Sequence, residues 1–438
     1  MGGVCSQGLA SWCGWAGEAR TAPLSASTEP NGPQTRHGQE LSKRQQKKQV
    51  LRDARQERKG MKKQQKQVDS MSSALTSLND LLAEHLGRPV STTEALVEVF
   101  GTSCQYRTLP LAHGPCPAEG LALLGGALLR PEKYNAKFLP QEYSLLHKLW
   151  SVFRGNLSNA GVLDIGAGNA NCAVLAAAVL GLMVICVERE SPRVELRAEE
   201  LLPESLKQRV IRVESDIADF DLSALTSLAQ KHHLQRFALV AKHPCGIGVD
   251  RSIDCALKLR ASGSSGPELL GVVIATCCTN KLSLDDFRAS RVQEFCDLNS
   301  SQLEVSVAVV KAVELMSRCS AWRSASGSLG NAIGEEQLRW AEAFEDNLQN
   351  LRLSRLRCGF GAVEEVRFAP SHCTLQDRCL LATAPPMPRG VLAHGGEDAA
   401  FLAQLALGVE QLRAKLGGPL DCRPKGLKSA KYDFDYSQ

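Results

Sequence analysis

The sequence has little that points to a membrane protein or a secreted one. No stretch supplies the roughly 18 consecutive apolar residues that a membrane-spanning helix needs. No secretory signal peptide is expected at the start of the chain. Aromatic residues make up only 5% of the 438 residues, and no internal repeat is visible. We expect one large domain or two ordinary ones, located in the cytoplasm or the nucleus.

The cysteines argue against both a disulfide scaffold and a zinc site. Sixteen cysteines are scattered along the chain without repeated close pairs, which is typical of reduced thiols that pack in a core. Cys104, His113 and Cys116 come nearest to a zinc cluster, but a tetrahedral site needs a fourth ligand. No metal site is therefore predicted.

Positive charge is concentrated in one segment, residues 41–67, which we call the basic arm. It holds 11 Lys and Arg against Asp53 and Glu57, a net +9, so the whole-chain charge of +4 leaves −5 for the remainder. The segment has few helix breakers and no apolar stripe, which favours a solvated helix. Charge of one sign on one arm indicates a polyanionic partner such as RNA.

The first 40 residues are rich in small polar residues and proline, and we predict that residues 1–40 are disordered. Gly2 with Ser6 fits the pattern for N-myristoylation, and Cys5 is a candidate for a second acyl chain. An acylated Gly2 together with the basic arm would give weak membrane association.

The rest of the chain changes from helices to alternating strands and helices. Residues 70–130 are expected to be helical and then rich in loops. From 131 to 390, continuous apolar strands alternate with helices, which indicates a parallel sheet covered on both faces. A C-terminal helix and tail follow over 391–438. The expected strands are 161–165, 182–187, 210–213, 237–241, 270–275 and a closing antiparallel pair at 361–368 and 379–384. The expected helices are 141–153, 170–180, 250–260, 336–352, 397–415 and a charged helix that ends near Arg209.

Polar residues stand where the first three of these strands end, and ligands of open α/β sheets bind beyond such ends. Glycines let the backbone approach a ligand closely, and an acid about 20 residues after the glycines suits the hydroxyls of a ribose. The first run, 164–169, resembles the first motif of class I S-adenosylmethionine methyltransferases. The resemblance implies an α/β Rossmann-like fold, S-adenosylmethionine as cofactor, and a binding set of Asp164, Gly166, Gly168, Asn169, Glu188 and Asp216, the last near the adenine amino group.

The fourth strand ends in an unusual group of reactive side chains, Lys242, His243 and Cys245. Pro244 cannot donate a hydrogen bond to a neighbouring strand and so helps to end this one. Asp250 follows where the next helix should begin. It is expected either to cap that helix, since aspartate is favoured at this position, or to take part in catalysis.

The stretch from Lys242 to Asp250 resembles the K-H-x-C-G-x-x-x-D motif of the eukaryotic tRNA 2′-O-methyltransferases that modify nucleotide four of the acceptor stem. Other segments are similar too, and the resemblance covers about residues 131–385. The other similar segments are Lys137 with Gln141, Ser144 and Leu145, then residues 274–278, and the closing strands with Leu375 between them. The chain departs from this family at Thr279 and Asn280, where two histidines are usual, and it shows no N-terminal zinc module. The basic arm is similar in composition to that of tRNA guanine-N1 methyltransferases acting at position nine.

This resemblance implies methyl transfer from S-adenosylmethionine to a ribose 2′-hydroxyl in the tRNA acceptor stem. The tRNA would contact the basic arm and the loops at the strand ends. In such a reaction the enzyme mainly aligns the groups and helps to remove the hydroxyl proton. Lys242 is the first candidate for orienting the hydroxyl and, if desolvated, for taking its proton. His243 is the second candidate for the base, and Cys245 completes the motif.

Three other functions remain open. Cys245 after Pro244, with Cys277 after Thr276, resembles the cysteine pair of RNA cytosine-carbon-5 methyltransferases, in which a thiolate attacks the base. Those enzymes carry an acid where this chain has His243. A protein methyltransferase of the same fold is a second alternative. The third is a non-enzymatic RNA-binding protein whose basic arm binds phosphates without reading sequence.

Overall fold

The computed structural model describes residues 118–242, 244–262, 266–276, 279–282, 335–369, 373–374, 377–384 and 397–422, with scattered positions between 51 and 89. The chain divides into two units, Met1–Gly60 and Met61–Gln438. The described positions of the first unit are helical and exposed. The predictions for Gly2, for residues 1–40, for most of the basic arm and for the tail after 422 lie outside the described residues.

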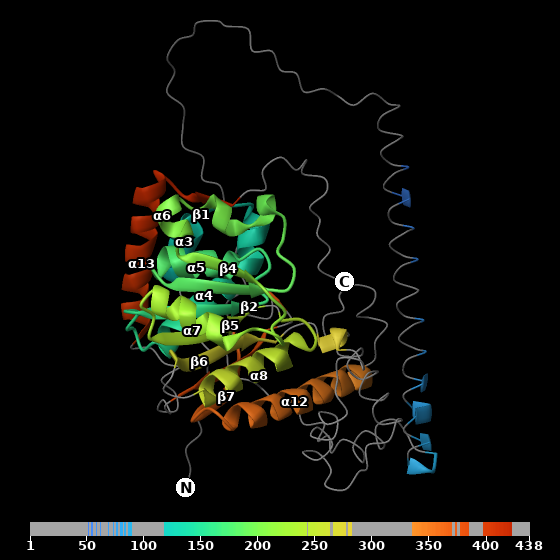
Figure 1. Ribbon diagram of the computed structural model, residues 1–438. Coiled ribbons are helices and arrows are strands. Elements are labelled where there is room, and N and C mark those ends of the chain that lie inside the picture. Colours follow the sequence, from blue (N-terminus) through green and yellow to red (C-terminus); the bar gives the residue numbers. More distant parts are fainter. Residues whose placement is uncertain are drawn as a thin grey trace, which may run out of the picture. The chain divides into compact units, whose positions relative to one another are not determined.

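The second unit contains a seven-stranded sheet in the order β4-β3-β2-β5-β6-β8-β7 (Figure 1). Only β8 among these strands runs antiparallel to its neighbours. This is the predicted class I methyltransferase fold, and all seven strands lie within two residues of the ranges expected from the sequence. Their bounds are β2 (Ala160–Ile165), β3 (Met183–Glu188), β4 (Val210–Glu214), β5 (Arg236–Ala241), β6 (Glu268–Ala275), β7 (Ala362–Arg367) and β8 (Arg378–Thr383).

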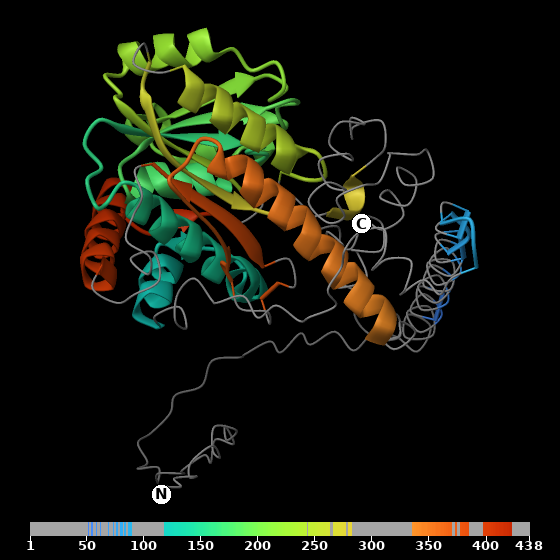
Figure 2. The same cartoon turned by 90° about the horizontal axis from the view of Figure 1, so that it is seen from below.

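Helices cover both faces of the sheet, because alternate strand residues point to opposite faces. Val162 of β2 belongs to one buried core, whereas its neighbours Leu163 and Ile165 belong to the other. The first core includes α3 (Ala118–Gly126), α4 (Glu132–Val152), α5 (Asn171–Val179) and α13 (Glu397–Leu416). The second core includes α7 (Leu222–Lys231), α8 (Gly248–Ala261) and α12 (Glu335–Arg357), which lie on the opposite side of the sheet (Figure 2).

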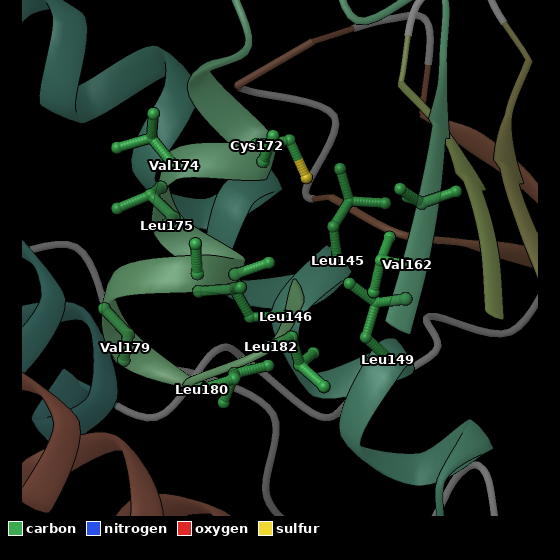
Figure 3. Close-up of a cluster of buried hydrophobic side chains, with 14 of the residues drawn as sticks. Leu145, Leu146, Leu149, Val162, Cys172, Val174, Leu175, Val179, Leu180 and Leu182 are labelled. Carbon is green, nitrogen blue, oxygen red and sulfur yellow. The ribbon is translucent and has the colours of Figure 1, made fainter. Parts of the chain in front are cut away.

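The first core is built mainly from leucine and alanine. Leu145, Leu146 and Leu149 of α4 point towards Val162 of β2 and towards α5, as Figure 3 shows. All four of these side chains are fully buried. Burying one such side chain stabilises a fold by about 1.5–3 kcal/mol, so this layer holds α4 and α5 firmly against the central strand.

The connection between β3 and β4 differs from the prediction of a charged helix, which was wrong. The chain forms two short 3₁₀ turns, η1 (Val194–Leu196) and η2 (Ala198–Leu201), and one turn of helix, α6 (Glu204–Lys207). Pro192 and Pro203 interrupt the segment, and a proline interrupts helical hydrogen bonding. Glu199, expected on a solvated helix surface, is instead buried.

Segments far apart in sequence close the first core. Helix α4 begins at Glu132 rather than Gln141, and α3 forms where loops were predicted. Strands β1 (Leu128–Leu129) and β9 (Leu420–Asp421) pair in parallel. Helix α13 packs against α3 and α5, so the residues around 118–130 and 397–422 share one core with the sheet. Among the described residues, no helix is both long and apolar enough to span a bilayer.

The contact between α13 and α5 depends on Gly408. A Cβ atom added there would lie 1.9 Å from the carbonyl oxygen of Val179. We predict that Gly408→Ala lowers the free energy of unfolding by about 1–3 kcal/mol or more, because overpacking a core usually costs that much. Urea denaturation measures it. Gly418→Ala is the matched control, because nothing lies within 4 Å of its added Cβ. Equal stability of the two variants would contradict this packing.

Candidate cofactor and methyl-transfer site

The predicted site residues meet at one edge of the sheet because the central strands pair in register. Asp164 near the end of β2 lies opposite Cys186 of β3 on one side and Val240 of β5 on the other. Glu188 and Lys242 follow at or just beyond the ends of β3 and β5. The strand order also reverses between β3 and β5, on either side of β2, which is where ligands of such sheets bind.

The loop after β2 takes the backbone conformation that its glycines allow. Gly166 and Gly168 have φ angles of 64° and 51°, and Ala170 has 60°. The left-handed region is costly for residues with a Cβ. A Cβ at Gly168 would meet nothing within 4 Å. The glycine is therefore needed for its positive φ angle and not for close packing, and its backbone is open to a ligand. That is the surface a ligand approaches.

Glu188 holds this loop and keeps the capacity to bind a ligand. Its Oε2 accepts a hydrogen bond from Gly168 N at 2.8 Å, and its Oε1 accepts one from Arg189 N at 3.1 Å. Each carboxylate oxygen has two lone pairs. The predicted ribose contact is therefore compatible with the observed bonds.

A buried ion pair that the sequence did not reveal fixes the other side of the loop. Arg212 of β4 donates to Gly168 O at 2.9 Å and to both carboxylate oxygens of Glu199, at 2.7 and 3.0 Å. Ala198 N also donates to Asn169 O at 2.9 Å. The segment that replaces the predicted helix thus positions Gly168 and Asn169. The side chain of Asn169 is exposed.

Asp164 is buried and carries an unsatisfied acceptor. Its Oδ2 has no hydrogen-bond partner among the described residues. Burial raises the pKa of this carboxyl to about 7, although the nearby Lys242 and Arg212 charges oppose the rise. A buried acceptor that lacks a donor suits a cationic group of a ligand, such as the ammonium of an amino acid moiety. The residues present therefore fit S-adenosylmethionine.

Asp216 lies just beyond β4, but its carboxylate already has partners. Both oxygens accept from Arg251 Nη1, at 2.9 and 3.1 Å, and Oδ1 also accepts from Ala218 N at 2.9 Å. Arg251 is in the first turn of α8. The predicted contact with adenine stays a prediction, and the structure adds Arg251 as a neighbour that the sequence did not suggest.

Lys242 sits in a largely buried group with α4. Its side chain is 13% exposed and its Nζ lies 4.0 Å from Oε1 of Glu142, which is 2% exposed. Glu142 also receives a two-pronged pair from Arg130, at 3.1 and 2.5 Å. The Nζ lies 5.2 Å from the centroid of the Phe138 ring. The sequence did not suggest Glu142 or Arg130 as site residues. The one signal for Glu142 is that it directly follows the motif residue Gln141.

The loop after Lys242 packs against the segment that follows β6. Gly246 has a φ of 61°, and a Cβ there would lie 2.7 Å from the carbonyl oxygen of Lys281, in the short turn η4 (Thr279–Lys281). Cys245 is half-buried and forms no disulfide with another described residue. His243, Cys277 and Cys278 lie outside the described residues, so the proposed base and the cysteine pair are not placed.

Asp250 does not cap helix α8, so that expectation was wrong. The helix begins at Gly248, after Ile247, and no side chain caps it. Asp250 is buried and accepts from Arg352 of α12 at 2.8 and 3.3 Å. Arg355 also lies 3.7 Å from its Oδ1. The last residue of the motif therefore ties the loop that follows Lys242 to α12.

Residues 141–352 match the family model described as Methyltransferase TRM13. This stretch is just under half of the 438 residues, and it is similar to the TRM13 methyltransferase family. The resemblance based on the motif from Lys242 to Asp250 is confirmed. The match supports methyltransferase chemistry for these residues, and S-adenosylmethionine is the cofactor that such chemistry uses. No match is found among the curated proteins.

Solved methyltransferase structures resemble the chain weakly. The CcbJ methyltransferase of Streptomyces caelestis is 22% identical with a TM-score of 0.22, and covers 33% of this chain and 52% of its own. A geranyl diphosphate C-methyltransferase of Streptomyces coelicolor A3(2) is 11% identical with a TM-score of 0.24, covering 59% and 95%. A putative O-methyltransferase of Nostoc punctiforme PCC 73102 is 12% identical with a TM-score of 0.25, covering 73% and 95%. The chain thus matches about half the length of the CcbJ methyltransferase.

We predict that Asp164 makes cofactor affinity and protein stability respond to pH in opposite directions. The folded pKa of about 7 exceeds the ordinary aspartate value of 3.8, so the folded state binds the proton more tightly than the unfolded state. Stability of the protein without cofactor should therefore fall between pH 4 and 7. The affinity for S-adenosylhomocysteine should rise from pH 5.5 to 7.5, as the carboxylate forms and accepts from the ligand's ammonium.

Calorimetric titration and thermal unfolding measure the two quantities. Asp164→Asn should flatten both dependences, bind the ligand more weakly, and be more stable than wild type at pH 8. A variant with unchanged affinity at pH 7.5 would show that Asp164 does not contact the ligand.

Proposed function

We propose that this protein is a tRNA methyltransferase that acts on a ribose 2′-hydroxyl in the acceptor stem, at nucleotide four. The observation that carries the proposal is the placement of Lys242. Its ammonium is held at the end of β5 by Glu142, within the electrostatic reach of Asp164. Residues that follow this strand face the methyl group and its acceptor in methyltransferases of this fold.

The chemistry requires alignment more than activation. The bound S-adenosylmethionine supplies a sulfonium methyl group that is already electrophilic. The protein has to hold a hydroxyl oxygen in line with that methyl and help its proton to leave. An ammonium with three donors, held at a fixed place, orients such an oxygen and stabilises the negative charge that develops on it.

The surroundings of Lys242 favour this orienting role over that of the base. A carboxylate 4.0 Å from Nζ and the face of an aromatic ring 5.2 Å away both stabilise a cation. The proton of the hydroxyl then needs another acceptor. We assign this role to His243, which follows Lys242 directly in the sequence.

We predict that Lys242→Ala lowers methyl transfer to total tRNA by about 10²-fold or more, the usual effect of losing a donor that stabilises a developing negative charge. The product is measured by nucleoside digestion and mass spectrometry with labelled S-adenosylmethionine. Affinity for S-adenosylhomocysteine should fall far less than the rate, because the loss of the Lys242 charge acts on the ligand only by letting the pKa of Asp164 rise further. Wild type should yield a 2′-O-methylated nucleoside from the acceptor stem.

The products separate the other candidates in the same experiment. A 5-methylcytidine product lost in Cys245→Ala would move the chemistry to the cysteine thiols. Cofactor binding without any RNA product would favour a protein substrate or an RNA-binding role without catalysis.

We also propose that the basic arm contributes to tRNA binding. Its net charge of +9 would release counterions from the phosphates it contacts. Deleting residues 41–67 should weaken tRNA binding and reduce the slope of log affinity against log salt concentration, measured by filter binding. The rate at saturating tRNA should change little. An unchanged affinity would remove the role assigned to the arm.

A further inference from the structure

The first two turns of α4 carry cationic and aromatic side chains beside Lys242. The ring of Phe138 lies 5.4 Å from Nζ of Lys137 and 5.2 Å from Nζ of Lys242, measured to its centroid. Tyr134 packs on the same ring, with centroids 6.0 Å apart and planes tilted by 35°. We call Tyr134, Lys137 and Phe138 the α4 cluster.

The α4 cluster forms the solvent side of the buried Lys242 group. Lys137 is exposed, and the two rings are half-buried. The backbone beneath them is held by Gln141, a buried side chain whose Nε2 donates to Lys137 O at 2.8 Å. The ammonium of Lys137 therefore projects from a fixed turn, and its stem has the freedom to follow a ligand.

The spacing of the two ammonium groups suits one unit of an RNA backbone. Since each lies within 5.4 Å of the same ring centroid, they are at most about 11 Å apart. The phosphates on either side of a ribose lie a few ångströms from its 2′-hydroxyl. A hydroxyl placed at Lys242 thus brings a flanking phosphate within reach of Lys137, with the sugar over Phe138.

An A-form stem presents these same groups together. Its shallow minor groove displays 2′-hydroxyls and the adjoining phosphates, and proteins recognise them largely without reading base sequence. Phosphate contacts set the register of the protein on the duplex. A lysine that fixes one phosphate next to the target ribose would help to place that hydroxyl in line with the methyl group.

We propose that the α4 cluster is an RNA-backbone subsite, in which Lys137 binds a phosphate next to the target ribose and Phe138 packs against that sugar. This inference rests on the proposed function, because it assigns the hydroxyl of that ribose to Lys242. It adds a ligand group, a phosphodiester, and gives Lys137 and Phe138 roles that the resemblance does not assign to them.

The salt dependence of tRNA binding tests the phosphate contact directly. Affinity of the full chain for total tRNA is measured by filter binding between 50 and 200 mM KCl, with S-adenosylhomocysteine present. Losing one phosphate contact lowers the slope of log affinity against log salt by about 0.7–0.9. We expect this change for Lys137→Gln and a near wild-type slope for Lys137→Arg.

Lys231→Gln provides the matched control. Lys231 is also an exposed lysine, but it ends α7, ahead of β5, and so lies at the opposite edge of the sheet. Its slope should equal that of wild type. If Lys137→Gln keeps the same slope as this control, Lys137 contacts no phosphate and the subsite is wrong.

Phe138→Leu tests the sugar contact, since leucine keeps apolar bulk but removes the ring. We expect single-turnover methyl transfer to slow by about tenfold, the scale of a misaligned reactant, with unchanged affinity for S-adenosylhomocysteine. An unchanged rate would overturn this half of the proposal.

The two proposals fail in different ways. If wild type makes no 2′-O-methylated product but Lys137→Gln still lowers the slope of log affinity against log salt, the proposed reaction is wrong and the phosphate contact is supported. A normal product with an unchanged slope overturns the phosphate contact alone.

Discussion

The register of the central strands is the constraint on which the whole site depends. Asp164 lies level with residues of both β3 and β5, so the loops after these strands start from nearly the same height. The glycine loop, the acid at Glu188 and the ammonium of Lys242 come together for this reason. A slip of one residue would exchange the two buried faces of a strand. The leucine-rich core on one face and the α8 and α12 core on the other therefore secure the register.

Buried ion pairs hold the loops and helices in place at this edge of the sheet. Glu142, Glu199 and Asp250 are all buried, and each faces an arginine that binds it through two nitrogen–oxygen contacts. A buried charge costs several kcal/mol unless it is paired in this way. Asp164 differs from them, because one of its oxygens has no donor among the described residues. The site is thus rigid around a carboxyl that a cationic ligand can satisfy, and binding would stabilise the fold as well as prepare the reaction.

The sequence allowed the sheet and the cofactor loop to be predicted because both leave local signals. The central strands β2, β3, β5 and β6 are largely apolar runs. The loop after β2 needs glycines where its backbone takes positive φ angles. The ion pairs left no such signal. Arg212 pairs with Glu199 13 positions away, and Asp250 with Arg352 102 positions away. Neither spacing follows a helix or strand period, and a charged residue considered alone suggests a solvated surface. That same assumption produced the incorrect charged helix between β3 and β4. For Asp250 the sequence suggested a helix cap or a catalytic role, and neither points to its actual partner Arg352, which lies 102 positions further on.

The pairing of β1 with β9 links the site to a late step in the synthesis of the protein. Arg130, which binds Glu142, follows directly after β1, and β1 is held by bonds from Leu420 to Ala127 and from Cys422 to Leu129. A nascent chain on the ribosome lacks this support until residues 420–422 have emerged. The ammonium of Lys242 then acquires its fixed position only after nearly the whole catalytic unit has been made. Chains truncated before β9 would accordingly carry every catalytic residue and still lack an ordered centre.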